Sequence, residues 1–350
     1  MNNKIKQFEL KPGYKISRVE KGSWQLSGGH GEIDRKQAIL DMARFVEAGI
    51  TTFDVADIYT GAEEMIGDYL RTLNIEQIRD KNIRIHTKYV PDKSILSSIT
   101  EADTVKIIDR SLQRLGLSCL DMVQFHWWDY NQPRYIETAQ VLARLQKAGK
   151  IRFVSVTNFD TIRLKQILDA GISVETIQLQ YSILDSRPDN SMINLCKPLG
   201  IKFLCYGTLA GGFLSNYWLD QPEPVELENR SLIKYKLIID DVCGSWNTFQ
   251  KLLKLLKEIS KKHEVSISNI ATKYVLQKSN VASVIIGNRN TNHLADTQSI
   301  FSYELDKSDI EQINSFISTY LQQLKGDCYD LERNDRRHSG IMKYNLNTKN

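Results

Sequence analysis

The segment TTFDVADIYTGAEEMIGDYLRTL, residues 51–73, contains one complete strand–loop–helix unit. Its start, Thr51–Ala56, is apolar or β-branched apart from one aspartate, which is typical of a buried strand. After a polar loop, Glu63–Leu73 carries apolar residues at spacings of three and four, which predicts an amphipathic helix. A strand followed by a helix is the unit from which parallel sheets are built.

The same alternation recurs along the chain. The other predicted strands are Val19–Gln25, Ile83–Tyr89, Leu120–His126, Arg152–Asn158, Thr176–Ser182, Lys202–Tyr206 and Ser283–Gly287. Further predicted helices are Arg35–Ala48, Ala102–Leu115, Arg134–Ala148 and Thr161–Ala170. Eight such units predict an α/β protein with a (β/α)8 TIM barrel rather than an open sheet. The stretch Gly28–Gly31 does not continue as G-x-G-x-x-G, so a Rossmann fold is not supported.

Three segments are additional to the eight strand–helix units of a minimal barrel. Thr208–Ser245 is predicted to be a long loop after the seventh strand. Phe249–His263 is predicted to be an amphipathic helix packed on the barrel, with a membrane or partner role as the alternative. The barrel domain is predicted to cover residues 1–325, followed by a polar tail, residues 326–350. That tail is either disordered or closes a pocket.

Composition limits the classes of function. The chain has 350 residues, 41% hydrophobic and 25% charged, with a net charge of +4 that is spread along the sequence. No clustered basic surface for nucleic acid is expected, and an apolar run long enough to span a membrane is absent. The five scattered cysteines favour neither a disulfide framework nor a zinc ribbon. Without a signal-like amino terminus, a cytoplasmic protein is expected.

Ionisable residues stand at three consecutive strand ends, where barrel active sites lie. Asp54 is in the second strand and Tyr59 follows it, Lys88 is in the third strand and His126 ends the fourth. A lysine ammonium beside a tyrosine favours the phenolate, and a carboxylate can hold that lysine in place. We therefore expect these four residues to form a proton-transfer site, with the imidazole orienting a carbonyl oxygen.

The order Asp54-x-Ala56-x-x-Tyr59, then Thr87-Lys88, then Phe125-His126 resembles the aldo-keto reductase family. The resemblance spans roughly residues 14 to 318. It also includes Gly22-Ser23-Trp24, Gly149-Lys150-Ile151-Arg152, Val156-Thr157-Asn158-Phe159, Gln178-x-x-Tyr181-Ser182, Tyr206-Gly207-x-Leu209-Ala210-Gly211-Gly212 and Val284-Ile285-Ile286-Gly287-Asn288-Arg289. It implies hydride exchange between a nicotinamide cofactor and a small carbonyl or alcohol, with Asp54, Tyr59, Lys88 and His126 as the catalytic residues.

The resemblance also implies cofactor contacts. Thr157, Asn158 and Gln178 would hold the nicotinamide carboxamide, and Tyr206 would stack on its ring. The remaining implied contacts are Gly22, Ser23, Trp24, Gly207, Leu209, Gly211, Gly287, Asn288, Arg289, His293, Asp296 and Thr297. Asn288 and Arg289 favour NADP(H) through the adenosine 2′-phosphate. His293 and the Asp296-Thr297 pair depart from the family pattern, so NAD(H) stays possible.

Trp24, Trp127 and Trp128 stand at predicted strand ends and are expected to line the substrate pocket. Polar aromatic and acidic residues there favour a hydroxylated or sugar-like carbonyl. Two other functions stay open. One is a nucleotide-binding redox sensor with slow turnover. The other is a metal-dependent barrel hydrolase that uses Asp54, Asp57, His86 and His126, although the resemblance implies no metal.

Overall fold

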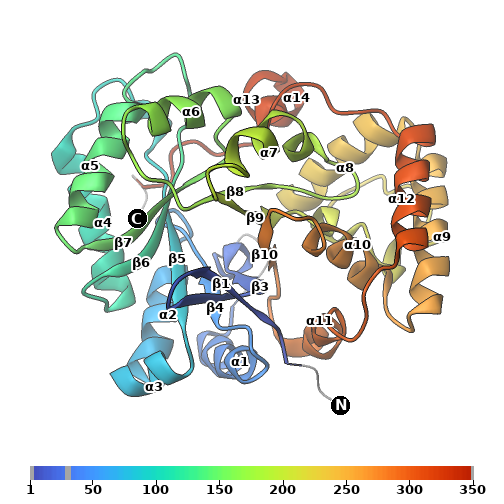
Figure 1. Ribbon diagram of the computed structural model, residues 1–350, viewed down its shortest axis with the longest axis horizontal. Helices are drawn as coiled ribbons and strands as arrows, with labels where there is room; N and C mark the ends of the chain where they lie inside the picture. The colour runs from blue at the N-terminus through green and yellow to red at the C-terminus, as the bar shows by residue number, and fades with distance from the viewer. Residues whose placement is uncertain (1–3, 28–32, 348–350) are drawn as a thin grey trace.

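The computed structural model describes residues 4–27 and 33–347, and Gly28–Gly31 lies outside them. Within the described residues, eight parallel strands close into a barrel in the order β10-β3-β4-β5-β6-β7-β8-β9 (Figure 1). They are β3 (Val19–Gly22), β4 (Thr52–Asp54), β5 (Arg84–Tyr89), β6 (Leu120–Phe125), β7 (Ile151–Thr157), β8 (Thr176–Gln180), β9 (Lys202–Tyr206) and β10 (Val281–Ile286). The predicted (β/α)8 barrel is confirmed.

The observed strands follow the predicted ones with small differences at their ends. The first was expected to reach Gln25, but β3 ends at Gly22. The amide of Ser23 still bonds to the carbonyl of Asp54, at 2.9 Å, and Trp24–Leu26 then turns into a short 3-10 helix. Trp24 therefore leaves the barrel wall at the carboxyl end of the strands.

A hairpin that the sequence analysis did not predict precedes the barrel. Its strands β1 (Gln7–Lys11) and β2 (Tyr14–Ser17) pair antiparallel. Tyr14 is buried, with its ring 4.8 Å from that of Phe153 and its hydroxyl 3.2 Å from Nε2 of His86. The hairpin thus packs at the end of the barrel where the strands begin, and the opposite end is left for chemistry.

Helices surround the barrel on its outer face (Figure 1). The helices are α1 (Arg35–Glu47), α2 (Ala62–Arg71), α3 (Ile75–Asp80), α4 (Glu101–Leu115), α5 (Tyr135–Lys147), α6 (Thr161–Asp169), α7 (Ser191–Cys196), α8 (Arg230–Cys243), α9 (Trp246–Lys262), α10 (Ile267–Leu276), α11 (Leu294–Ser299), α12 (Lys307–Tyr320), α13 (Asp330–Asn334) and α14 (Arg336–Ser339). Apolar faces of these helices and of the strands form one continuous core. The residues that the structure describes include no helix that is both long and apolar enough to cross a bilayer.

The prediction that Thr208–Ser245 is a continuous loop was wrong, because α8 occupies its second half. The side chain of Asn229 accepts a hydrogen bond from the amide of Leu232 and caps the helix. Its buried residues have the spacing of one helical face: Tyr235, Ile238, Ile239 and Val242. The tail is ordered over its described part, and it forms α13 and α14.

The predicted amphipathic helix is confirmed as α9. Its apolar stripe is buried, and it consists of Phe249, Leu252, Leu253, Leu256 and Ile259. The helix packs mainly against α8, α10 and α12, so it belongs to an outer layer of helices rather than touching the strands directly. The stripe is therefore part of the protein's own core.

This packing predicts different costs for two leucine truncations. Leu256→Ala removes a side chain that is 0% exposed, and it should lower the free energy of unfolding by about 2 to 5 kcal/mol. Leu40→Ala, at a position that is 57% exposed, should change it by less than about 0.5 kcal/mol. Urea unfolding followed by circular dichroism measures both. Equal effects would show that the α9 stripe is not buried in solution.

Candidate active site

Lys88 and Asp54 form an ion pair at the carboxyl end of the barrel strands. Nζ of Lys88 donates to both carboxylate oxygens of Asp54, at 2.8 and 2.6 Å, and to the carbonyl of Val55 at 3.2 Å. Both side chains are almost fully buried. Burial acts to lower the pKa of Lys88, but the charges of Asp54 and Tyr59 outweigh it and raise that pKa. Lys88 is therefore an ammonium at neutral pH.

Tyr59 lies in the loop after β4, beside this ion pair. Nζ of Lys88 is 4.9 Å from the centroid of the Tyr59 ring. Burial raises the pKa of Tyr59, and Lys88 only partly offsets this effect. The expectation of a net lowered pKa is thus wrong for the protein without ligand, because loss of water outweighs the neighbouring charge. Tyr59 carries its proton at neutral pH.

His126 follows β6 and is buried in its neutral form. Burial, then the charge of Arg333, lowers its pKa to about 3. Nδ1 donates to the carbonyl of Thr157 at 3.2 Å, because a carbonyl can only accept. Nε2 of the neutral ring is then an acceptor, and it is buried without a partner among the described residues. In this tautomer Nε2 can accept from a hydroxyl but cannot donate to a carbonyl oxygen.

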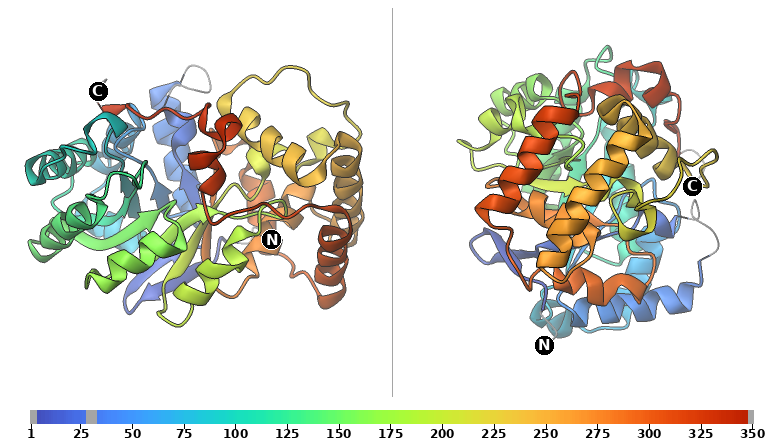
Figure 2. Two further views of the ribbon diagram at one scale, coloured as in Figure 1. Left: turned by 90° about the horizontal axis from the view of Figure 1, so that it is seen from above. Right: turned by 90° about the vertical axis from the view of Figure 1, so that its right-hand side faces the viewer.

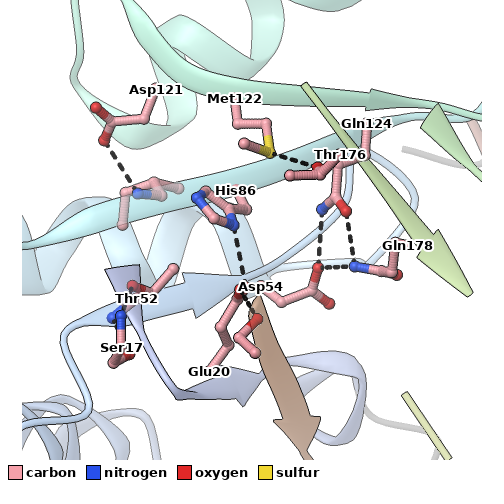
Figure 3. A network of polar contacts seen from close by, with 12 residues as sticks. Ser17, Glu20, Thr52, Asp54, His86, Asp121, Met122, Gln124, Thr176 and Gln178 are labelled. Carbon is pink, nitrogen blue, oxygen red and sulfur yellow. Dashed lines mark hydrogen bonds and ion pairs between the residues drawn. The ribbon is translucent and has the colours of Figure 1, made fainter. Parts of the chain in front are cut away.

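Two glutamines complete the surroundings of Asp54 inside the barrel (Figure 3). Nε2 of Gln178 donates to Oδ1 of Asp54 at 2.6 Å and to Gln124 at 2.9 Å. Gln124 also donates to Oδ1 of Asp54, at 3.0 Å. Gln178, expected to hold a carboxamide, therefore uses its amide nitrogen to fix Asp54. Gln124 was missed, although it lies two residues before His126 and period two places both on one face of β6.

The residues expected around a nicotinamide lie at the carboxyl ends of β3, β7 and β9. Oγ of Thr157 and Oγ of Ser23 are buried without hydrogen-bond partners among the described residues. Asn158 has a φ of 61°, and its side-chain oxygen accepts from the hydroxyl of Tyr206 at 2.8 Å. Buried unpaired hydroxyls next to a half-buried aromatic ring fit a polar, planar ligand group, so these residues suit the carboxamide and its ring.

The glycine-rich loop after β9 lies under α8. Gly207 and Gly211 have positive φ, and a Cβ on either would come within 2.3 or 2.7 Å of Tyr235. Leu209 begins the 3-10 turn between them. Gly22 is similarly close to the backbone of β10, where a Cβ would lie 3.3 Å from the carbonyl oxygen of Ile286. These three glycines of the implied cofactor set thus have no room for larger side chains.

The residues expected at the adenosine end divide into two kinds. Arg289 and His293 are exposed, Gly287 is exposed at the end of β10, and Asn288 is buried. Asp296 accepts hydrogen bonds from Ser266 and Asn269, both at 3.0 Å. Thr297 donates to the carbonyl of His293 at 2.9 Å. Asp296 therefore joins α11 to α10, Thr297 bonds within its own helix, and Arg289 and His293 are exposed.

The three tryptophans differ in position. Trp24 is half-buried with its ring 5.0 Å from that of Tyr59, and Trp128 is half-buried with its ring 4.3 Å from that of His126. Trp127 is fully buried, and its indole nitrogen donates to the carbonyls of Asp129 and Gln132. Trp24 and Trp128 border the four central residues, whereas Trp127 belongs to the core.

A second buried polar cluster, which the sequence analysis missed, lies deeper in the barrel (Figure 3). Glu20 is 3.0 Å from Nδ1 of His86 and accepts from Ser283 at 2.5 Å. Although burial acts to lower the pKa of His86, the charge of Glu20 and its hydrogen bond raise it. The signal that could have found Glu20 is its spacing of two from Gly22 along β3.

Comparison with known proteins agrees with this arrangement. A model of the aldo/keto reductase family matches residues 18–318. Aldo-keto reductase YhdN of Bacillus subtilis is 26% identical, over 90% of this chain and 94% of its own length. The NADH-specific methylglyoxal reductase of Escherichia coli is 24% identical, over 84% of this chain and 92% of its own.

Solved structures show the same fold. A glycerol dehydrogenase from Gluconobacter oxydans superposes with a TM-score of 0.75 at 20% identity, covering 93% of this chain and 98% of its own. An aldo-keto reductase from Bacillus halodurans gives 0.67 at 23% identity, covering 89% and 96%. With a family match over nearly the whole barrel, this chain belongs to the aldo/keto reductase family.

Proposed function

We propose that the protein is an NAD(P)(H)-dependent oxidoreductase that reduces an aldehyde or ketone to an alcohol, or catalyses the reverse reaction, with Tyr59 as the general acid and base. Membership of the family establishes oxidoreductase chemistry in outline. The observation that carries the proposal is the contact of one buried ammonium, Lys88, with both Asp54 and Tyr59. This contact lies at the barrel end where such sites are found.

The three residues have separate roles in moving one proton. A bound nicotinamide nucleotide would supply or accept the hydride. In reduction, Tyr59 donates its hydroxyl proton to the carbonyl oxygen and becomes a phenolate. Lys88 stabilises that phenolate, because an ammonium at this distance favours the charged form. Asp54 keeps Lys88 in position, and in oxidation the phenolate takes the proton back.

His126 contributes to the choice of substrate. Nε2 of His126 is a buried acceptor. It would repel the lone pairs of a simple carbonyl oxygen, because both atoms are acceptors. A hydroxyl on the carbon next to the carbonyl would donate to Nε2 while Tyr59 donates to the carbonyl oxygen. We therefore favour a hydroxylated or sugar-like carbonyl. The name of one relative, an L-glyceraldehyde 3-phosphate reductase, is consistent with a small hydroxylated aldehyde.

NADP(H) is the favoured cofactor, with NAD(H) as the alternative. Thr157, Asn158 and Tyr206 would hold the nicotinamide, and exposed Arg289 would bind the 2′-phosphate through its planar fork. The alternative has support as well, since one relative is named an NADH-specific reductase and Asp296 is committed to other hydrogen bonds.

The structure favours the reductase over a metal hydrolase. The proposed ligands have different partners: Asp54 binds Lys88, Asp57 accepts from the amide of Val90, and His86 pairs with Glu20. In the described residues no three histidine, cysteine, aspartate or glutamate side chains lie close enough together to hold a metal ion. An ammonium within the proposed ligand set would also repel a cation.

Tyr59→Phe tests the proton donor. It should lower kcat for aldehyde reduction by about 10² or more and leave cofactor affinity nearly unchanged, because only the acid is lost. Steady-state rates and tryptophan-fluorescence titration with NADPH measure the two effects, and Tyr217→Phe, at an exposed position, is the control. Near-normal rates in the variant would contradict the assignment. If the wild type does not oxidise bound NADPH in a single turnover with any of a panel of aldehydes, the redox-sensor function gains instead.

The pH dependence follows from the raised pKa of Tyr59. Reduction uses the protonated phenol, so Tyr59 should cause no loss of kcat as pH rises from about 6 to about 9. Oxidation uses the phenolate, so the kcat for oxidation should rise across the same range.

Lys88→Met removes the charge that acts to lower the pKa of Tyr59, and it should reduce the oxidation rate at every pH. Stopped-flow rates in both directions measure this, and a reduction rate that falls between about pH 6 and pH 9 would conflict with a raised pKa.

Arg289→Gln tests the cofactor preference. Loss of a charge-assisted contact should weaken NADPH binding by about tenfold or more and change NADH binding by less than about twofold. Fluorescence titration with both nucleotides measures this, and Arg79→Gln, which alters a distant surface arginine, is the control. An equal loss of affinity for NADPH and NADH would contradict a contact between Arg289 and the 2′-phosphate.

A further inference from the structure

The C-terminal strap, residues 326–347, runs across the carboxyl end of the barrel. Near its start, Oδ2 of Asp327 accepts from the amide of Thr161 at 2.8 Å. At its other end the carbonyl of Tyr344 accepts from the amide of Lys93 at 2.9 Å, and Asn347 donates to the carbonyl of Val90 at 2.8 Å. The left view of Figure 2 shows the chain passing from α12 on one side to the C-terminus on the other.

The inner side of the strap contacts the residues of the proposed site. The ring of Tyr329 meets that of His126 edge to face, with centroids 5.6 Å apart. The ring of Tyr344 meets that of Trp128 in the same way, at 5.1 Å. Substrate that reaches His126 therefore lies under the strap.

Arg333 is a residue of this strap whose hydrogen bonding is incomplete. Its guanidinium carbon lies 4.2 Å from the ring centroid of Tyr130 and 5.0 Å from that of Tyr329, and Nη2 donates to the carbonyl of Trp127 at 2.8 Å. Nε and Nη1 are buried and have no hydrogen-bond partner among the described residues. The indole nitrogen of Trp128 is likewise buried and unpartnered.

Three other buried or half-buried cations at this end of the barrel have carboxylate partners. Lys88 pairs with Asp54, Arg187 with Asp185 at 2.7 Å, and Lys234 with Glu332 at 3.1 Å. The charge of Arg333 acts to lower the pKa of Asp160. The Asp160 carboxylate, however, caps α6 and pairs with Arg163. A guanidinium out of water without a counter-ion is costly, so an anion there would stabilise the closed strap.

We propose that Arg333 and the indole nitrogen of Trp128 form an anion-binding subsite, and that the substrate carries a carboxylate or a phosphate group near its carbonyl. A planar guanidinium fork with free donors suits either group. The strap closes over this group and places the carbonyl beside Tyr59. This inference rests on the proposed reductase function and adds the charge of the substrate to it.

Matched substrates test the subsite. Glyceraldehyde is compared with glyceraldehyde 3-phosphate, and butanal with 4-oxobutanoate, in the wild type, Arg333→Gln and Arg333→Lys. In Arg333→Gln, the KM for the anionic member of a pair should rise by about tenfold or more, while kcat/KM for the neutral member changes by less than about twofold. Arg333→Lys should recover part of the affinity, because it restores charge without the fork. Arg336→Gln, at an exposed position of the same strap, should change neither value.

The two pairs separate the two anions, since a phosphate site would favour the first pair and a carboxylate site the second. Equal losses for neutral and anionic substrates in Arg333→Gln would overturn the subsite and leave the reductase function standing. If no substrate is turned over, the reductase function fails. Tryptophan-fluorescence titration of the wild type and Arg333→Gln with inorganic phosphate and with acetate then decides the subsite: binding lost in the variant supports it, and absence of binding to the wild type rejects it.

Discussion

The ion pair between Lys88 and Asp54 is the constraint on which the rest of the site depends. Placing an ammonium and a carboxylate inside a barrel is costly unless both find additional hydrogen bonds. Here Lys88 gains the carbonyl of Val55, and Asp54 gains the amides of Gln124 and Gln178. Strands β4, β5, β6 and β8 thus supply one connected group, so the reactive phenol is held by the barrel wall rather than by its own loop.

The polar group around Lys88 and Asp54 lies above a second polar group inside the same barrel. Glu20, His86 and Ser283 form the lower group, and the hydroxyl of Tyr14 reaches it from the amino-terminal hairpin. The charge of Asp54 also contributes to the raised pKa of His86, so the two groups are coupled electrostatically. The hairpin thus contributes the Tyr14 hydroxyl to the buried polar group below the proposed site.

The sequence was sufficient to predict structural units that repeat along the chain and groups of residues that follow a regular pattern in it. Alternating strands and helices gave the barrel, and strand ends gave Asp54, Tyr59, Lys88 and His126 as one group, which the structure brings together. The same reasoning missed the hairpin and α8, because Tyr14 finds His86 only through the closed barrel and the helix follows a polar, proline-containing stretch. It also gave the wrong direction for the pKa of Tyr59, since the extent of burial is a property of the fold.

The two cations Lys88 and Arg333 differ in a way that no sequence pattern reveals. Lys88 has its carboxylate within the protein, so its charge is available to the phenol whether or not substrate is present. Arg333 comes from a chain segment more than 200 residues from its hydrogen-bond partner Trp127, and its Nε and Nη1 have no partner among the described residues. A compensated charge suits catalysis because it needs no rearrangement during the reaction. An uncompensated charge on a strap suits binding, because the ligand itself completes the closed state.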